Sequence, residues 1–234
     1  MPIVNVMQEH ELKNAYIGEY GWKPWANTVG YRPLTTTTQW ADQSWNWYDL
    51  SGSYRTFWTY AGVDCVEVSW WSNSNPRLYN ANIPIWNSRT WLVWFYCTVA
   101  SNNDRWVICT WHDYVNGIIG GWLTTSNNTP YVTDRYTYNA AWTWNLINSW
   151  HLMAITYDGT TAILYIDGTE NTRYNWTRTS DTGIAFSHKA YSGWWSQYSE
   201  RFTWYMSEAI YEDKVRTAQE VLGYYNQTKA NYGL

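Results

Sequence analysis

The segment Trp150–Glu170, WHLMAITYDGTTAILYIDGTE, constrains the fold of this 234-residue chain more than any other. Two apolar runs flank the dipeptide Asp158-Gly159, and Asp167-Gly168 follows the second run. Such dipeptides supply the positive φ angles that tight hairpin turns require. Both faces of Ala162–Ile166 are apolar, so we expect this strand to be covered on both sides. The segment therefore predicts antiparallel strands within a layered β fold.

The chain after residue 26 continues as short β-prone runs separated by polar turns. The expected strands are Thr28–Leu34, Val63–Trp70, Arg89–Val99 (a central strand), Arg105–Thr110, Ile118–Thr124, Tyr131–Tyr138 and Phe202–Tyr211. One helix is expected over residues 217–229, where Thr217 and Glu220 fit a capping box. Ala218, Val221 and Tyr225 predict its buried stripe. Many short strands and one terminal helix favour an all-β sandwich.

Composition excludes several partners. Only 15% of residues are charged, the net charge is −4, and no basic run occurs, so binding to nucleic acid or to an anionic membrane surface is not expected. The longest apolar run, Trp91–Ala100, has half the roughly 20 residues that span a bilayer. The first residues lack the pattern of a secretory signal, so a soluble protein is expected.

The three cysteines are interpreted as buried core residues rather than as a disulfide framework or a zinc site. Cys65, Cys97 and Cys109 are an odd number at wide spacing, and each lies in a β-rich stretch. We expect each cysteine to be a small buried apolar residue, and a disulfide between one pair of them is left open.

The hairpin, a late strand and the capped helix together form a recognisable pattern. The motifs are Trp150-His151, Tyr157-Asp158-Gly159, Leu164–Gly168, Glu208–Asp213 and Thr217–Tyr225. They resemble the LamG-like branch of the concanavalin A-like lectin/glucanase superfamily over residues 27–234. The resemblance implies a jelly-roll β-sandwich of two antiparallel sheets. It specifies no activity, because this superfamily includes lectins, hydrolases, adhesion domains and structural proteins.

One turn departs from the family pattern. Where the family usually has D-x-S-G-N-G, this chain has Trp45 and Trp47 at the two glycine positions. Far from this turn, in the late strand expected over Phe202–Tyr211, Trp204 replaces a residue that is usually small in the family. An aromatic residue is strained where a turn needs positive φ. Either these tryptophans are UGA codons that the source organism reads as glycine, or they are real and make aromatic contacts. Peptide mass spectrometry of native material would distinguish the two hypotheses.

The sequence offers no clear catalytic centre, so no enzyme activity is expected. Glycosidases need two close carboxyl groups, and the E-x-D-x-x-E strand of the superfamily's glucanases is absent. Glu208 and Glu212 share a strand face but lie too far apart, at roughly 13 Å. An acid pair from separate strands is left open. His151 is interpreted as a hydrogen-bonded structural residue.

Binding of carbohydrate or calcium is the chemistry that the sequence allows. Exposed aromatic faces beside polar groups are typical of sugar sites. The candidate sugar-binding residues are Trp70, Trp71, Trp111, His112, Asp113, Trp194 and Trp195. Calcium is the common ion of the resembled family, and the candidate oxygen ligands here are Asp104, Asp113 and Asn116. Turn-forming roles are the alternative for these Asn and Asp residues.

Two functions from different classes follow. In the first, residues 1–26 form an extended arm, similar to that of some phage and uncultured-bacterial surface proteins. A non-catalytic sandwich then assembles through this arm into a homo-oligomer or a larger surface or virion structure. In the second, the domain is a lectin-like carbohydrate-binding module that uses loop-edge tryptophans. A glycoside hydrolase is the third and weakest reading.

Overall fold

The computed structural model describes eleven stretches of the chain. They are residues 28–33, 55–68, 78–84, 88–98, 105–110, 120–123, 129–133, 138–140, 146–175, 182–186 and 205–234. The expected arm at residues 1–26 and the suspect Trp45, Trp47 and Trp204 lie outside them. The predictions about the arm and these tryptophans therefore stay predictions.

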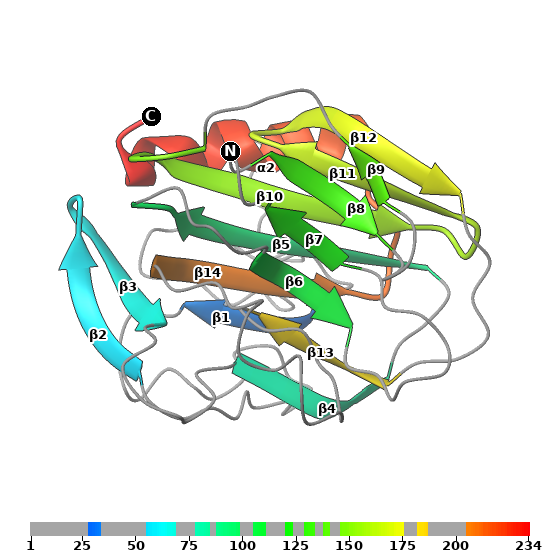
Figure 1. The fold of residues 1–234 in the computed structure, drawn as a ribbon, viewed down its shortest axis with the longest axis horizontal. Coiled ribbons are helices and arrows are strands. Elements are labelled where there is room, and N and C mark those ends of the chain that lie inside the picture. The colour runs from blue at the N-terminus through cyan, green and yellow to red at the C-terminus, as the bar shows by residue number, and fades with distance from the viewer. Residues whose placement is uncertain are drawn as a thin grey trace, which may run out of the picture.

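Two antiparallel sheets form the body of the protein (Figure 1). The larger sheet has the order β12-β11-β10-β5-β14-β3-β2, with β1 also paired to β14. Its strands are β1 (Thr28–Pro33), β2 (Arg55–Tyr60), β3 (Val63–Val68), β5 (Arg89–Tyr96), β10 (Trp150–Tyr157), β11 (Thr161–Ile166), β12 (Thr169–Asn175) and β14 (Tyr205–Glu212). This arrangement confirms the predicted β-sandwich and the central position of the Arg89 strand.

The smaller sheet has the order β4-β13-β6-β7-β8-β9. Its strands are β4 (Leu78–Pro84), β6 (Arg105–Thr110), β7 (Gly120–Leu123), β8 (Pro130–Thr133), β9 (Tyr138–Ala140) and β13 (Thr182–Phe186). The single strand expected over Tyr131–Tyr138 was wrong, because β8 and β9 are separate strands that pair with each other. A continuous β-prone run cannot show where a chain folds back on itself.

The larger sheet is buried on both faces, which explains its two-sided apolar sequence. On one face Val93, Phe95, Met153 and Ile155 belong to the core that includes Val107 of the smaller sheet. The opposite face forms a second core with the C-terminal helix, through Leu92, Trp94, Leu152, Ala154 and Tyr165. Successive residues of a strand point to opposite faces, so β5 and β10 must be apolar at almost every position. The expectation that Ala162–Ile166 is covered on both sides is confirmed.

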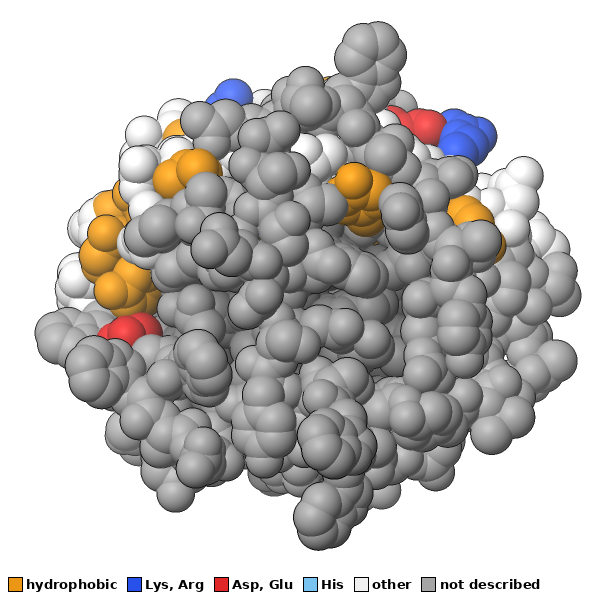
Figure 2. Space-filling model, viewed as in Figure 1, with side chains coloured by type: hydrophobic (Ala, Val, Ile, Leu, Met, Phe, Trp, Pro, Cys, Tyr) orange, Lys and Arg blue, Asp and Glu red, His pale blue; other side chains and the backbone are white. Residues whose placement is uncertain are grey.

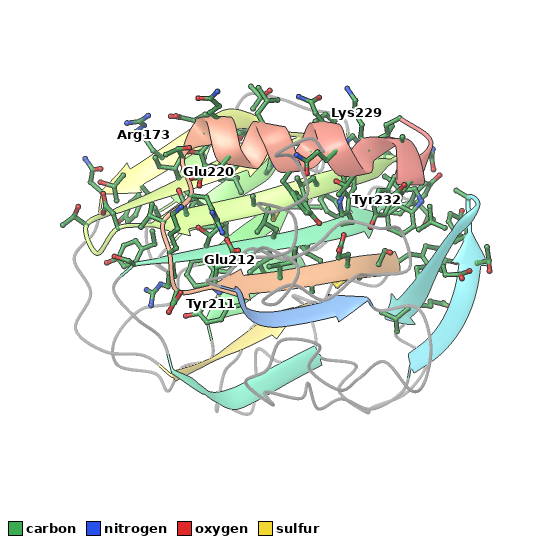
Figure 3. All side chains as sticks on the ribbon, turned by 180° about the vertical axis from the view of Figure 1, so that it is seen from behind. Arg173, Tyr211, Glu212, Glu220, Lys229 and Tyr232 are labelled. Atoms are coloured by element: carbon green, nitrogen blue, oxygen red, sulfur yellow. The ribbon has the colours of Figure 1, made fainter. Side chains whose placement is uncertain are left out.

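The helix α2 (Ala218–Thr228) continues into a short 3-10 helix, η1 (Lys229–Tyr232), and both lie against the outer face of the larger sheet (Figure 3). The predicted capping box is present, because the Thr217 hydroxyl accepts from the Glu220 N–H and the Glu220 carboxylate accepts from the Thr217 N–H. The predicted stripe was partly wrong. Val221, Tyr224 and Thr228 are buried, whereas Ala218 is exposed, because the docked face follows the i, i+3, i+7 positions.

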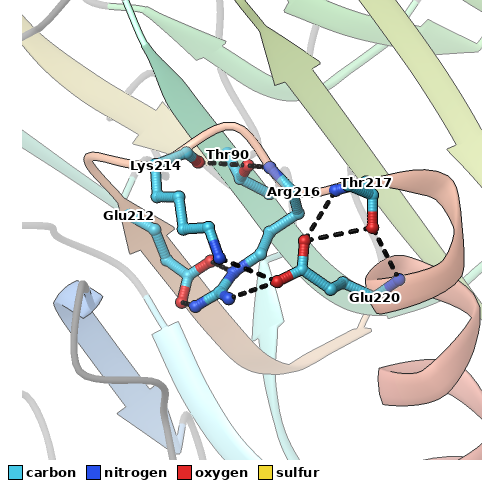
Figure 4. Close-up of polar contacts among 6 residues, drawn as sticks. All are labelled: Thr90, Glu212, Lys214, Arg216, Thr217 and Glu220. Atoms are coloured by element: carbon cyan, nitrogen blue, oxygen red, sulfur yellow. Dashed lines mark hydrogen bonds and ion pairs between the residues drawn. The ribbon is translucent and has the colours of Figure 1, made fainter.

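A buried ion pair fixes the start of this helix (Figure 4). Arg216 Nε and Nη2 donate to the two oxygens of Glu212 at 2.7 and 2.9 Å, and the two side chains are only 4% and 0% exposed. Arg216 Nη1 and Lys214 Nζ both donate to Glu220 Oε1. Burial alone would raise the pKa of Glu220, but these donors and the Thr217 N–H outweigh it and lower the pKa to about 2.

The same connection is tied to the centre of the sheet through Thr90 of β5. The Thr90 hydroxyl donates to the Lys214 carbonyl at 2.6 Å and accepts from the Arg216 N–H at 2.9 Å. Two backbone groups of the chain reversal, the Lys214 carbonyl and the Arg216 N–H, thereby have hydrogen-bond partners.

Two of the cysteines confirm the predicted packing role. Cys65 and Cys97 are both fully buried, one in each core. Burial raises the pKa of the Cys65 thiol to about 12, so it stays protonated at neutral pH. The side chain of Cys109 lies outside the described residues.

We predict that Arg216→Met destabilises the protein by about 3–5 kcal/mol, because it leaves the Glu212 carboxylate buried without its cation. Urea denaturation would measure this loss. Arg173→Met is the matched control, since the Arg173–Glu170 pair is exposed and should add little. Equal effects of the two substitutions would contradict the structural role of the buried pair.

We also predict that Gly168→Ala destabilises the protein by more than about 1 kcal/mol. Gly168 has φ +78°, and an added Cβ would lie 2.9–3.1 Å from atoms of Leu222 and Tyr225. Gly223→Ala is the control within the helix, where nothing lies within 4 Å. That change should stabilise by about 0.5–1 kcal/mol. Thermal denaturation of both variants would test the expected opposite signs.

Candidate binding site

None of the residues that the sequence singled out for binding falls within the described stretches. The sugar-binding candidates Trp70, Trp71, Trp111, His112, Asp113, Trp194 and Trp195 lie outside the described residues, as do the calcium candidates Asp104 and Asn116. Within the described stretches, no group of three or more His, Cys, Asp or Glu residues is arranged to hold a metal ion. No helix in those stretches is long and apolar enough to cross a membrane.

A cluster of tyrosines lies at one end of the larger sheet instead. Tyr60 ends β2, Tyr96 ends β5 and Tyr205 begins β14. The register pairs Tyr205 with Tyr96 on one side and with Glu67 of β3 on the other. Residues that are directly opposite in an antiparallel pair share a face, so these side chains meet on the helix side of the sheet.

The rings of this tyrosine cluster contact one another closely. Tyr60 stacks on Tyr205 with ring centroids 4.0 Å apart and planes 15° apart. Tyr60 meets Tyr96 edge-on at 4.8 Å, and Tyr96 in turn meets Trp150 edge-on at 5.6 Å. Tyr96 is only 8% exposed, whereas Tyr60 and Tyr205 are half-buried. The cluster is therefore anchored in the core and reaches solvent at its outer pair.

Negative charge lies beside the cluster, because the strand register places Glu67 opposite Tyr205. Figure 2 views the side of the molecule away from the helix, and there hydrophobic side chains and an acidic group lie at the left edge, where Figure 1 places the β2–β3 hairpin. Burial raises the pKa of Tyr205, and the negative charge of Glu67 adds to the rise. Burial also raises the pKa of Tyr96, and the neighbouring Tyr60 raises it further.

This arrangement has the parts that a sugar site requires. A flat ring face contacts the apolar C–H surface of a sugar, and a nearby carboxylate accepts hydrogen bonds from sugar hydroxyls. Sequence reasoning missed the cluster, because it considered tryptophans and could not know that three strand ends become neighbours. In the sequence the cluster is marked by a tyrosine at the end of β2, at the end of β5 and at the start of β14.

The carboxylates that were considered for glycoside hydrolysis are engaged elsewhere. Glu208 is 8% exposed and accepts a 2.7 Å hydrogen bond from the Tyr224 hydroxyl of the helix. Glu212 is held by Arg216. Both side chains therefore attach the C-terminal segment to β14.

His151 is hydrogen-bonded through both ring nitrogens, as the structural interpretation of this residue predicts. Its Nδ1 lies 2.7 Å from Asp167 Oδ2, and its Nε2 lies 2.7 Å from Ser149 Oγ. His151 alternates with Trp150 along β10, so this chain of three residues lies on the face of the sheet opposite the tyrosine cluster.

Comparison with known proteins supports the fold. No family model matches the chain, and no curated protein sequence matches it. The binding domain of botulinum neurotoxin serotype D superposes with a TM-score of 0.61 at 13% identity, covering 86% of this chain and 50% of that domain. The chain thus spans about half the length of that domain.

Two further structures extend the comparison. Domain 4 of AbnA, a GH43 extracellular arabinanase from Geobacillus stearothermophilus solved in complex with arabinotriose, superposes with a TM-score of 0.61 at 11% identity, covering 84% of this chain and 97% of that domain. A Trypanosoma rangeli sialidase superposes with a TM-score of 0.66 at 8% identity, covering 97% of this chain and 38% of the sialidase. At such low identities the likeness shows the β-sandwich fold, which is shared by binding domains and by an enzyme chain.

Proposed function

We propose that this chain is a carbohydrate-binding β-sandwich module of the LamG-like type, in which Tyr60 and Tyr205 form the surface that contacts the sugar. The observation that carries the proposal is the half-exposed stacked pair, which is held in place by buried Tyr96 and flanked by the Glu67 carboxylate. An aromatic surface that is rigid before binding loses little conformational entropy when a ligand docks.

The comparisons support a binding role more than an assembly role. A domain with the same fold, aligned over nearly its whole length, is in complex with arabinotriose. A second neighbour is a toxin binding domain. Assembly into a virion or cell-surface structure through residues 1–26, with a location outside the cell, remains a separate proposal that light scattering of the full chain and of a chain without the arm would test. Calcium binding through Asp104, Asp113 and Asn116 is likewise a proposal.

Binding is proposed rather than glycoside hydrolysis. Hydrolysis needs two carboxyl groups about 5–5.5 Å or 6.5–9.5 Å apart and free to act on the substrate. Among the described residues, Glu208 and Glu212 both bond to groups of the C-terminal segment.

We predict that Tyr205→Ala weakens oligosaccharide binding by about five- to tenfold, because one stacked ring contributes roughly 1–1.5 kcal/mol. Isothermal titration with arabinotriose and a panel of neutral oligosaccharides would measure the loss. Glu67→Gln should weaken binding to a smaller extent, since the amide still accepts a hydrogen bond from a hydroxyl.

Tyr225→Ala is the matched control, because Tyr225 is also half-buried and ring-stacked but lies on α2 against Trp94. The melting temperature of each variant shows whether it is folded. Failure of the wild-type chain to bind any oligosaccharide, or an equal loss in Tyr225→Ala, would contradict the proposal.

A further inference from the structure

Ser149, His151 and Asp167 form a continuous hydrogen-bonded chain at one end of the larger sheet. Ser149 precedes β10 and His151 is the second residue of that strand, so the two side chains project to the same face. Asp167 comes from the turn between β11 and β12, beside the start of β10. The Ser149 Oγ to His151 Nε2 distance is 2.7 Å, and the His151 Nδ1 to Asp167 Oδ2 distance is also 2.7 Å.

The carboxylate is fixed by a further hydrogen bond, and because a carboxylate oxygen accepts, the hydrogen bonds among the three residues can be given a direction. Asp167 Oδ1 accepts the Leu152 N–H at 2.9 Å, so the other oxygen is aimed at the imidazole. When Nδ1–H donates to this carboxylate, the lone pair of Nε2 faces the Ser149 hydroxyl and accepts its proton. This order of a hydroxyl, an imidazole base and an orienting carboxylate is the arrangement that activates serine nucleophiles.

We infer that Ser149 is an activated nucleophile toward small acyl esters, with His151 as its general base and Asp167 as the residue that positions the imidazole. The three groups are partly shielded but reachable, since the side chains of His151 and Asp167 are 12% and 16% exposed and Ser149 is half-buried. Partial exclusion of water strengthens the electrostatic support from Asp167.

Backbone hydrogen bonds hold the residue before Ser149 and the turn residue Asp167, both of which have positive φ angles. Asn148, directly before Ser149, has φ +61°, and Asp167 has φ +52°. The Asn148 N–H donates to the Cys97 carbonyl at 2.6 Å, and the Asp167 N–H donates to the Leu152 carbonyl at 2.9 Å. These bonds anchor the backbone that presents Ser149 and Asp167.

The reaction is an acyl transfer to water. Ser149 Oγ forms a bond to the ester carbonyl carbon while its proton passes to His151 Nε2. Collapse of the tetrahedral intermediate breaks the bond to the alcohol oxygen, which takes the proton from His151. Water then attacks the acyl-serine with His151 again as base, which releases the carboxylic acid and restores the serine hydroxyl.

This inference goes beyond the proposed carbohydrate binding and does not depend on it. The tyrosine cluster lies on the helix side of the sheet, and the three hydrogen-bonded residues Ser149, His151 and Asp167 lie on the other side.

The test is covalent labelling of the full chain with a fluorophosphonate, followed by peptide mapping, together with release of p-nitrophenol from p-nitrophenyl acetate. We expect Ser149 to be labelled at least tenfold faster than Ser88, which is exposed and serves as a reference within the same molecule. His151→Ala and Asp167→Asn should each lower the labelling rate at least tenfold. Added imidazole should restore part of the rate in His151→Ala, which a purely structural histidine would not allow.

Labelling of the wild-type chain decides the matter even where a variant fails to fold. If Ser149 reacts no faster than Ser88, the inference is overturned and the three residues only link β10 to the β11–β12 turn. Equal labelling of Ser149 in wild type and in folded His151→Ala would overturn it as well. A tenfold loss in folded Asp167→Asn with no change in melting temperature would establish the positioning role.

Discussion

The rest of the structure depends on the burial of the larger sheet on both faces. Strand β5 is buried at every position, and β10 at all but one. Such strands are stable only when each face is covered by another layer, because apolar surface left in water costs about 25 cal/mol per Å². The smaller sheet covers one face, and the C-terminal helix covers the other. The helix is therefore part of the architecture rather than an appendage.

The position of the helix follows from polar contacts as well as from packing. Arg216, Glu212 and Thr90 tie the connection before the helix to β5 and β14. Further along, Leu222 and Tyr225 pack against Gly168 in the turn between β11 and β12. This turn also presents Asp167 to His151. The helix thus supports, through one turn, the residue that orients the imidazole on the far side of the sheet.

Both candidate sites lie at the same end of the larger sheet, where β5 ends and β10 and β14 begin. Along the middle of the strands, side chains are committed to the two cores. At the strand ends the layers stop, so tyrosine rings reach solvent on one face and a serine–histidine–aspartate chain forms on the other. Function at the ends of a sandwich is compatible with the fold, because changes there leave the cores intact.

Local signals in the sequence determined much of the fold. The Asp-Gly turns, the two-sided apolar runs and the capping box at Thr217 act over a few residues, so the hairpin, the central strand and the helix could be predicted. His151 could likewise be predicted to be hydrogen-bonded. What the sequence could not supply was pairing between distant segments. Tyr60, Tyr96 and Tyr205 are separated by long stretches of chain, and only strand register makes them neighbours. Ser149 meets His151 by strand alternation, but Asp167 reaches them only because β11 returns antiparallel to β10. The tertiary structure decided these sites, since side chains combine into a site only after backbone hydrogen bonding has set the register.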